Sequence, residues 1–273
     1  VLGMHYFSPV EKMPLLEVVV TDKTDEESRT AAINLGQRQG KTVIVVKDGP
    51  GFYTTRILTP YMDEVAELLK EGVPFHRLDQ AMQEIGFPVG PVTLMDEVGL
   101  DVAIHVAEDL GDAFGERVSS KETSLLKALE TKGCLGRKSG KGFYLYEKTK
   151  KQKKAKKLAN PVALHLLREG KTIKGKLPSK EDIQKRLLYR MINEAATCFE
   201  ENIISRPEDG DIGAVFGLGF PPIYGGPFRH LDSLGAKKFA DEMKSFEDQF
   251  GGRFTPANII LEKIQSQKSF YSA

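Results

Sequence analysis

The sequence contains an internal repeat, and this feature constrains the fold more than any other. Arg56-Ile57-Leu58 returns 130 residues later as Arg186-Leu187-Leu188, and Gly86-Phe87-Pro88 returns 133 residues later as Gly219-Phe220-Pro221. Two small insertions explain the drift in spacing, so we expect two copies of one structural unit. Further matches are Glu64 with Glu194 at 130 and, at 136, Gly90-Pro91 with Gly226-Pro227, Asp96 with Asp232 and Gly99 with Gly235.

Each copy is expected to be helical, because apolar residues recur at three- and four-residue spacing. The first copy begins with a helix from Thr55 to Gly72, in which Pro60 introduces a kink or marks the true start. In the second copy, Ser179 and Asp182 form a capping-box pattern before an apolar helical face. The other elements expected in the first copy are helices over Phe75–Ile85, Val92–Leu110 and Thr123–Lys132, then a loop with a short extended end over Gly136–Tyr146.

The first 48 residues have a different pattern. Leu15–Thr21 and Thr42–Val46 are apolar and β-branched, as in strands, and Asp25–Gly40 between them has helical spacing. We interpret this region as the closing part of a doubly wound sheet. The run Gly36–Thr42 is one residue short of a Walker A loop and has a helix before it and a strand after it, so it does not predict a nucleotide site.

Composition excludes several classes of protein. The 273 residues carry a formal net charge of +1, which argues against wholesale binding to nucleic acid. No apolar run approaches the roughly 18 residues of a membrane span. The two cysteines, Cys134 and Cys198, lie in unrelated contexts, so we expect a reducing compartment and no metal site. The residues after Val1 do not have the pattern of a targeting peptide, as expected if the chain begins within a longer protein.

A basic run, Lys148–Lys157, is the sharpest shift in composition and predicts a solvated linker between the two copies. An alternative is contact with anionic lipid headgroups or with the phosphates of a coenzyme A ester. The expected division of the chain is an α/β region over residues 1–48, a first helical copy over 49–147, the linker over 148–178 and a second copy over 179–273.

His5 and Glu17 are the candidate acid/base residues. A carboxylate bonded to one ring nitrogen of a histidine fixes its tautomer and raises the basicity of the other nitrogen. Twelve residues is too far for a shared helix face, but two short extended segments joined by the turn Ser8–Lys12 could bring the pair together. From spacing alone, a structural histidine stays the more common alternative.

Five ordered blocks resemble the 3-hydroxyacyl-CoA dehydrogenase family, most closely its multifunctional α subunits of mitochondrial fatty-acid β-oxidation. The blocks are GMHYFSPV from Gly3, LLEVV from Leu15, VVKDGPGFYTTRIL from Val45, GFPVGPVTLMDEVGLD from Gly86 and GRKSGKGFYLY from Gly136. The resemblance implies an α/β fold followed by mostly α: the closing part of a Rossmann-like NAD-binding domain, then two tandem helical C-terminal repeats of this family. In multifunctional members the second repeat packs as a partner of the first, so the second copy is expected to be structural.

The implied reaction is NAD-dependent oxidation of an L-3-hydroxyacyl-CoA to the 3-ketoacyl-CoA, with His5 as the base and Glu17 as its orienting carboxylate. Ser8 and Thr55 stand where family members carry substrate-binding asparagines, so the role of Thr55 differs from the family pattern. The glycine-rich NAD motif is absent from this chain, so the 273 residues alone are expected to be inactive. An acyl groove, or ordinary helical core, is expected from Phe52, Tyr53, Phe87, Pro88, Val89 and Met95.

The resemblance also implies partners: an acyl-CoA substrate, a homodimer or a thiolase β subunit, and contact with an anionic membrane surface. Mitochondrial localisation, in the matrix or at the inner membrane, is expected from the same source, as is an enoyl-CoA hydratase upstream in the protein. An alternative function is a helical dimerisation or thiolase-docking module without catalysis. A dehydrogenase acting on a sugar or small hydroxy acid is disfavoured, because such enzymes typically use a lysine base. His230 is expected at a packed or partly exposed helix end rather than in a site.

Overall fold

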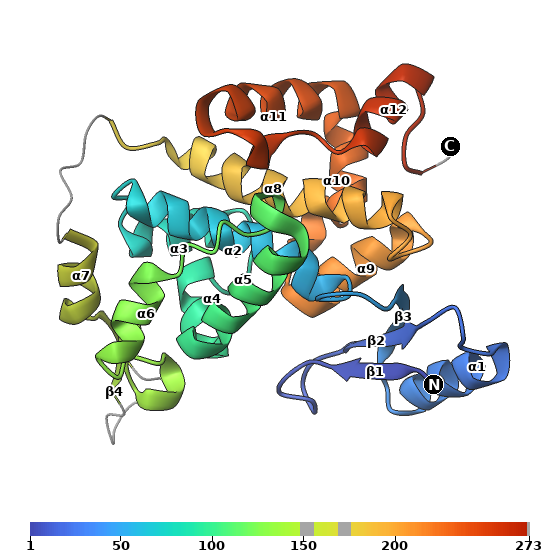
Figure 1. The fold of residues 1–273 in the computed structure, drawn as a ribbon, viewed down its shortest axis with the longest axis horizontal. Helices are drawn as coiled ribbons and strands as arrows, with labels where there is room; N and C mark the ends of the chain where they lie inside the picture. Colours follow the sequence, from blue (N-terminus) through green and yellow to red (C-terminus); the bar gives the residue numbers. More distant parts are fainter. Residues whose placement is uncertain (148–155, 169–175, 272–273) are drawn as a thin grey trace. The chain divides into compact units, whose positions relative to one another are not determined.

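The computed structural model describes residues 1–147, 156–168 and 176–271 (Figure 1). The chain divides into two compact units. Unit 1 consists of residues 1–60 and 189–273, and unit 2 consists of residues 61–188. The boundaries fall within two long helices, α2 (Thr54–Lys70) and α8 (Lys180–Glu200). This division cuts across the expected order of domains, because each unit takes residues from both helical copies.

The α/β region of unit 1 is a three-stranded sheet. Its strands are β1 (Gly3–Tyr6), β2 (Leu15–Val20) and β3 (Thr42–Lys47), in the order β1-β2-β3. The β1-β2 pair is antiparallel, and the β2-β3 pair is parallel and connected through α1 (Glu26–Arg38). Asp25 caps this helix by accepting a hydrogen bond from the Ser28 backbone N–H. The expected α/β fold is confirmed.

Strand β2 is buried on both faces, and the two faces contact different elements. Side chains alternate along a strand, so Leu16 and Val18 point one way and Leu15 and Glu17 the other. Leu16 and Val18 form a core with Ala32 of α1. Helix α9 (Pro207–Leu218) packs against β2 and β3, and the Leu15 and Glu17 side chains are fully buried.

Unit 1 is completed by the second helical copy. After residue 189, the later part of α8 is followed by α9, η3 (Pro222–Tyr224), α10 (Pro227–Leu234), α11 (Ala236–Phe250), η4 (Gly252–Phe254) and α12 (Asn258–Ser266). The expected capping box at the start of α8 is present: the Ser179 hydroxyl accepts a hydrogen bond from the Asp182 N–H and donates one to the Asp182 carboxylate.

Unit 2 holds most of the first helical copy and the residues after it. After the later part of α2, its elements are α3 (Phe75–Glu84), α4 (Pro91–Val98), α5 (Leu100–Phe114), η1 (Gly115–Arg117), α6 (Ser124–Thr131), η2 (Arg137–Ser139), β4 (Tyr144–Glu147), β5 (Lys156–Ala159) and α7 (Pro161–Arg168). Strands β4 and β5 form an antiparallel pair.

Three expectations about these helices need correction. The helix expected over Val92–Leu110 is two helices, because Gly99 has φ 106° and breaks the chain direction between α4 and α5. Pro60 lies inside α2 and does not mark its start, which is at Thr54. The region expected to be a linker contains secondary structure, since Lys156 and Lys157 belong to β5. The rest of the basic run, residues 148–155, lies outside the described residues.

The repeat reappears as two buried arginine clusters. In unit 1, Arg56 Nε lies 2.7 Å from Glu194 and Arg56 Nη2 lies 2.7 Å from Glu201. In unit 2, Arg186 Nε lies 2.7 Å from Glu64, and its two terminal nitrogens lie 2.8 and 2.6 Å from the Glu71 oxygens. An arginine of one copy thus pairs with the glutamates of the other copy in both clusters. Because their partners are provided, these charges can be buried.

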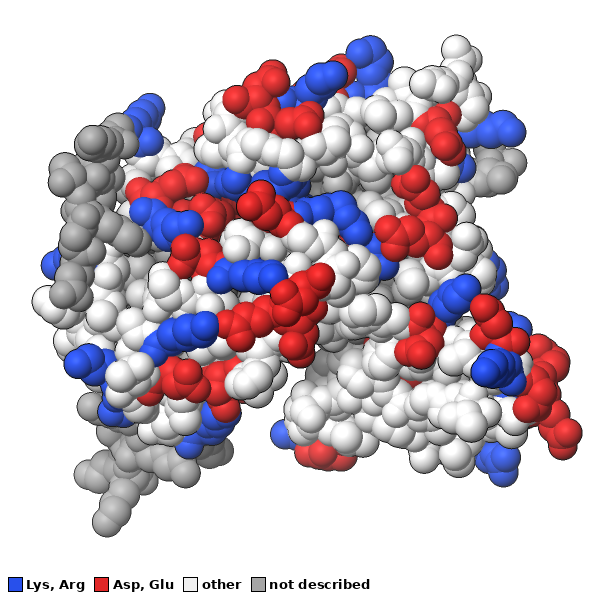
Figure 2. All heavy atoms as spheres, in the orientation of Figure 1, with Lys and Arg blue, Asp and Glu red and all other residues white. Residues whose placement is uncertain are grey.

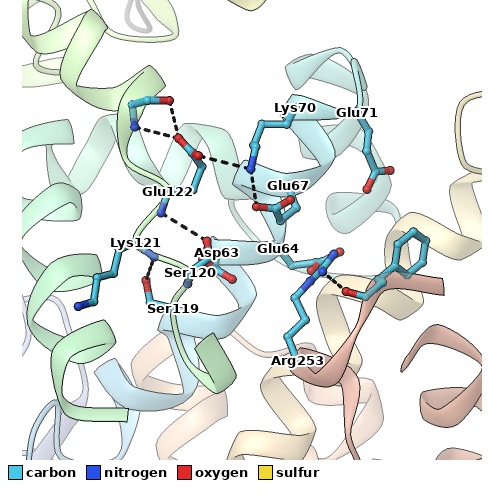
Figure 3. A network of polar contacts seen from close by, with 12 residues as sticks. Asp63, Glu64, Glu67, Lys70, Glu71, Ser119, Ser120, Lys121, Glu122 and Arg253 are labelled. Carbon is cyan, nitrogen blue, oxygen red and sulfur yellow. Dashed lines mark hydrogen bonds and ion pairs between the residues drawn. The ribbon is translucent and has the colours of Figure 1, made fainter. Parts of the chain in front are cut away.

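Other charged residues of unit 2 form smaller networks. Asp63 accepts hydrogen bonds from the Ser120 N–H and hydroxyl at 2.8 and 2.7 Å, and Lys70 lies between Glu67 and Glu122 (Figure 3). On the face of the molecule in view, charges of both signs are mixed rather than gathered by sign (Figure 2). Among the described residues, no helix is both long and apolar enough to cross a membrane.

Candidate active site

The structure brings His5 and Glu17 together. They are register partners on the antiparallel strands β1 and β2, and His5 Nδ1 lies 2.6 Å from Glu17 Oε2. Opposed residues in an antiparallel pair project to the same face, so the twelve-residue spacing is bridged by the sheet itself. The Glu17 side chain is fully buried, and the His5 side chain keeps 33% of its surface exposed.

The second oxygen of Glu17 is held by the start of helix α2. The Thr54 backbone N–H donates a hydrogen bond of 3.0 Å to Glu17 Oε1. Thr54 is the first residue of a 17-residue helix, so this N–H has no partner within the helix and lies at the positive end of its dipole. Both carboxylate oxygens are therefore paired, which a buried carboxylate requires. The donor is a backbone group, so no residue type in the sequence marks this contact. Its sequence signal is the Gly49-Pro50-Gly51 breaker, which indicates a helix start nearby.

This arrangement determines which ring nitrogen of His5 carries the proton. A carboxylate can only accept hydrogen bonds, so Nδ1 carries the proton of the neutral imidazole and Nε2 is left with its lone pair. The rings of Phe7 and Phe52 flank the imidazole, with centroids 4.7 and 5.5 Å from it. Phe52 has a left-handed φ of 46°, and it places its ring beside the imidazole immediately before α2. The pair can accept a proton from a hydroxyl at Nε2 of this partly exposed ring.

The other predicted site residues are less constrained. Ser8 is exposed and follows β1, next to a cis peptide bond to Pro9. Thr55 is half-buried in the first turn of α2, beside Thr54, which is the residue that contacts the dyad. The structure tests neither as a substrate contact, so both stay predictions.

The residues expected to form an acyl groove, or ordinary helical core, are divided between the two units. Phe52 lies next to the His5 ring, whereas Tyr53 is buried and donates a hydrogen bond to the Gly210 carbonyl at 3.0 Å. Both belong to unit 1. The remaining four belong to unit 2, where Phe87 is buried and stacks on Tyr61 with a centroid distance of 5.7 Å. These four are Phe87, Pro88, Val89 and Met95.

His230 and the two cysteines are the other titratable side chains considered from the sequence. His230 is half-buried in α10 against the Tyr224 ring, 4.4 Å between centroids, and burial lowers the pKa of its imidazole. Cys134 and Cys198 are buried free thiols. Within residues 1–147, 156–168 and 176–271, no group of three or more His, Cys, Asp or Glu side chains could hold a metal ion.

The residues present fit one part of a nicotinamide cofactor site. An acid/base dyad at a sheet edge can take the proton of an alcohol, but an alcohol oxidation also needs an acceptor for hydride. None of the 273 residues forms a G-x-G-x-x-G turn, the element that holds a dinucleotide pyrophosphate at a helix start. The chain thus contains a His–Glu dyad that could exchange a proton beside a nicotinamide, and the printed sequence contains no phosphate-binding turn of this kind.

Comparison with known proteins identifies two family matches. Residues 1–49 match the 3-hydroxyacyl-CoA dehydrogenase, NAD binding domain, and residues 51–146 match the 3-hydroxyacyl-CoA dehydrogenase, C-terminal domain. The matches cover the sheet with its dyad and the first helical copy.

Curated relatives match along almost the whole chain. The fatty acid oxidation complex subunit alpha of Shewanella loihica is 46% identical over 272 residues, and that of Vibrio parahaemolyticus is 44% identical over 271 residues. In both cases the alignment covers 99% of this chain and 37% of the relative. The chain therefore spans little more than a third of the length of these relatives.

Solved structures show the same fold. The 3-hydroxybutyryl-CoA dehydrogenase of Escherichia coli aligns with 97% of this chain and 70% of its own, with a TM-score of 0.78 and 23% identity. The dehydrogenase part of multifunctional enzyme 1 from C. elegans aligns with 96% of this chain and 59% of its own, with a TM-score of 0.69 and 24% identity.

The expected mitochondrial localisation is wrong. It rested on the resemblance to mitochondrial α subunits, but the curated relatives that match the whole chain come from the bacteria Shewanella and Vibrio.

Proposed function

The chain belongs to the 3-hydroxyacyl-CoA dehydrogenase family, and we propose that it provides the catalytic acid/base pair of an NAD-dependent L-3-hydroxyacyl-CoA dehydrogenase of fatty-acid β-oxidation. The observation that carries this proposal is the His5–Glu17 hydrogen bond of 2.6 Å, with its carboxylate fully buried and its imidazole partly exposed. The names of the matched families and relatives support the choice of substrate and cofactor.

In the proposed reaction, His5 Nε2 removes the proton from the 3-hydroxyl of the acyl thioester. Hydride leaves C3 as the C–O single bond becomes a carbonyl, and bound NAD⁺ supplies the acceptor for that hydride. The Nδ1–H of His5 donates to Glu17 throughout, so the charge that forms on the imidazole is balanced by a carboxylate that cannot rotate away. Phe7 and Phe52 restrict water around the ring, which strengthens this interaction.

Removing the base tests this proposal in the full-length protein. His5→Ala is expected to lower kcat by roughly 10²- to 10⁴-fold, the usual contribution of general base catalysis. Glu17→Gln keeps the shape of the side chain but lets the amide donate as well as accept, so it is expected to lower kcat with little change in KM. His105→Ala is the control, because His105 is an exposed histidine of α5. Unchanged kcat in either dyad variant would refute the assigned roles.

The proposal also fixes what this chain lacks. The isolated 273 residues are expected to show little or no NAD-dependent oxidation of 3-hydroxyacyl-CoA, because the phosphate-binding turn is missing from them. The domain boundaries at residues 48, 147 and 178 remain part of this proposal. Limited proteolysis of the full-length protein, with mass spectrometry of the fragments, tests where the chain is cleaved first. Robust turnover by the isolated chain would contradict the proposal.

Ser8 and Thr55 are proposed to contact the substrate near its reacting end. Thr55 lies one residue after the N–H that holds Glu17, and Ser8 lies three residues after His5 on the same chain segment. Thr55→Val removes the hydroxyl at nearly constant volume and is expected to raise KM for the acyl-CoA more than it lowers kcat. Ser8→Ala is expected to have a smaller effect, since Ser8 is exposed. Steady-state kinetics with wild-type KM in both variants would exclude these contacts.

Assembly is a second candidate function of the helical copies, favoured by the name of the relatives, which are subunits of a complex. We propose that the full-length protein associates with a second kind of subunit, of the thiolase class, or with its own copy. Light scattering of the purified protein, alone and mixed with a thiolase subunit, separates the two. Contact with an anionic membrane surface is tested by flotation with vesicles, and a monomer that binds neither partner would leave only the catalytic role.

A further inference from the structure

We propose that helix α9 of the second repeat positions the catalytic dyad, with Gly213 and Gly217 as its positioning residues. This inference rests on the proposed function, because it concerns the geometry of His5 and Glu17. It changes the role of the second repeat, which was expected to be structural only. The repeat would contribute the buried surface against which the Glu17 carboxylate is held.

Gly217 is the point of closest approach. A Cβ atom at this position would lie 2.6 Å from Leu15 Cδ2 and 3.3 Å from Thr54 Cγ2. Leu15 shares the face of β2 with Glu17, and the Thr54 N–H donates to Glu17 Oε1. The bare backbone of α9 therefore contacts two of the residues that set the position of the carboxylate. A third neighbour, Phe7 Cε1, would be 3.6 Å from that Cβ and belongs to the ring that flanks His5.

The same face of α9 continues one turn earlier. A Cβ at Gly213 would lie 2.9 Å from Ile44 Cδ1 and 3.1 Å from the Tyr53 ring. Ile44 is the register partner of Glu17 on β3. Tyr53 precedes Thr54 and is fixed by a hydrogen bond from its hydroxyl to the Gly210 carbonyl of α9. Helix α9 thus contacts residues on each side of Glu17, which explains why the carboxylate is fully buried.

The first repeat provides an internal comparison. Its counterpart of α9 is α3, aligned through Asp79 and Asp211, each of which accepts hydrogen bonds from the start of the following helix. At the two places where α9 has Gly210 and Gly213, α3 has Leu78 and Ala81, both buried. The repeat frame therefore accommodates side chains at these positions. Glycine costs up to about 1 kcal/mol per residue in a helix interior. In α9, Gly213 allows a close approach to Ile44 of β3 and to the Tyr53 ring, and Gly210 allows one to Phe228, Ile204 and the Tyr53 hydroxyl.

A compensating pair of substitutions tests the inference in the full-length protein. Gly217→Ala places a methyl group where Leu15 Cδ2 lies and is expected to lower kcat roughly tenfold, with a smaller change in KM, by displacing Glu17. Leu15→Val alone leaves a cavity beside the carboxylate and is expected to lower kcat as well. In the double variant the added methyl fills the space that the smaller side chain leaves, so kcat is expected to exceed that of either single variant.

A control separates positioning from mere loss of stability. Gly251 lies in the same unit, after α11, with φ 88° and ψ −175°, a backbone region that is essentially confined to glycine, and a Cβ there would have no atom within 4 Å. Gly251→Ala is therefore expected to lower Tm through local backbone strain without affecting kcat at temperatures well below Tm. Equal losses of kcat in the two variants would overturn the inference, as would a double variant no better than Gly217→Ala.

A spectroscopic measurement keeps the inference distinct from the proposed function. The downfield proton resonance of the His5 Nδ1–H reports its hydrogen bond to Glu17 without any turnover. We expect this resonance to shift or broaden in Gly217→Ala, to return in the double variant and to be unchanged in Gly251→Ala. A wild-type protein without dehydrogenase activity would refute the proposed function while the resonance still tested α9. If the wild type is active and Gly217→Ala changes neither the resonance nor kcat, the role of α9 is refuted and the proposed function is not.

Discussion

In both helical repeats an aspartate joins the start of a helix to the C-terminal end of the repeat, and we call this arrangement the closure of the repeat. In the first, Asp79 accepts hydrogen bonds from the Val92 N–H and the Tyr144 hydroxyl, both at 2.8 Å. In the second, Asp211 accepts from the Phe228 N–H at 2.7 Å and from the Tyr271 hydroxyl at 2.6 Å. Each carboxylate therefore ties the start of one helix to the end of its repeat, which identifies the C-terminal Phe270-Tyr271 as the counterpart of Phe143-Tyr144.

A second aspartate in each repeat also accepts hydrogen bonds from the end of that repeat. Asp96 accepts from the backbone N–H groups of Phe143 and Tyr144, and Asp232 accepts from those of Phe270 and Tyr271, all at 2.9 Å. The repeats differ in what surrounds this frame. Asp96 gains a third donor from the Tyr146 hydroxyl at 2.9 Å and is 1% exposed, whereas Asp232 is half-buried.

The difference teaches which positions carry the fold and which carry a role. Carboxylates that accept from the backbone are kept in both copies, because buried N–H groups need partners in either context. The surface that packs on neighbouring elements is not kept: it is leucine and alanine in α3 and glycine in α9. Changes in this surface follow what each helix contacts, and α9 packs on β2, the strand that carries Glu17.

The largest expected effect tests whether the arginine clusters are equivalent. Arg56→Met and Arg186→Met each remove the arginine from a buried glutamate, Glu194 in one case and Glu64 in the other, and each should cost about 3–5 kcal/mol in denaturant unfolding. Burial lowers the pKa of Arg186, but its hydrogen bonds and charge pairing with Glu71 and Glu64 outweigh this and raise it.

Two further variants sharpen this test. Arg186→Met with Glu64→Met removes both charges and should recover most of the loss, since an apolar pair of similar volume fits a buried site. Arg29→Met breaks an exposed pair with Glu26 and should cost under about 0.5 kcal/mol. A loss of unfolding free energy in only one of Arg56→Met and Arg186→Met would show that the two arginine clusters are not equivalent.

The second-largest expected effect is a loss of stability that differs between the two repeats. Asp96→Ala removes a buried acceptor from three donors and should destabilise the protein by about 3 kcal/mol, whereas Asp232→Ala should cost about 1–2 kcal/mol, because its two donors can reach water. Hydrogen exchange at the Phe143 and Phe270 amides checks the local consequence. Faster exchange is expected at Phe143 in the first variant only and at Phe270 in the second only, and loss of both protections together would show that the two closures are coupled.

A pH dependence is expected from the second repeat. Burial raises the pKa of Asp211 from 3.8 to about 6, despite opposing hydrogen bonds from Tyr271 and Phe228. The folded state therefore favours the protonated acid. The contribution of Asp211 to the free energy of unfolding is fully present below about pH 4 and is lost as the pH rises through about 6.

The measurement compares the wild type with Asp211→Asn. Between about pH 7 and about pH 5, the wild type should gain about 1 kcal/mol of unfolding free energy relative to the variant, which has no group to titrate at this position. Denaturant titrations at several pH values measure this difference. A gain of the same size in the variant would assign the effect to another group.

Much of this fold could be predicted from residue patterns. The β-branched runs at Leu15 and Thr42 specify a sheet, and the offset between Arg56 and Arg186 identifies the duplication. The His5–Glu17 pair could be proposed because a two-residue strand period and a turn bring opposed residues together. These features are local or periodic, which is why a single sequence reveals them.

The rest depends on contacts between distant residues. The Thr54 N–H that holds Glu17 is a backbone group, so no residue type marks it. Helix α9 approaches β2 about 200 positions along the chain, and three glycines in a helix would ordinarily indicate a weak helix rather than close packing. The break at Gly99 was missed because apolar spacing continues through it, although a positive φ ends α4 there.

The smallest expected effect concerns the one cation that each closure places over its tyrosine. Lys157 Nζ lies 2.9 Å from Asp79 Oδ2 and 3.6 Å from the Tyr144 ring centroid, and the Arg229 guanidinium lies 3.4 Å from the Tyr271 centroid. Both cations are partly or fully exposed, so screening limits their contribution.

Lys157→Met and Arg229→Met keep an apolar stem and remove the charge. We expect losses of about 0.5–1 kcal/mol for Lys157 and less for Arg229, because Lys157 pairs with a carboxylate as well as with a ring. High salt should shrink the Lys157 effect and change the Arg229 effect little, since the ion pair is the part that salt screens. Thermal unfolding at low and high salt measures both. A larger loss at Arg229 would mean that the cation over the ring, and not the pair with Asp79, is the common element of the two closures.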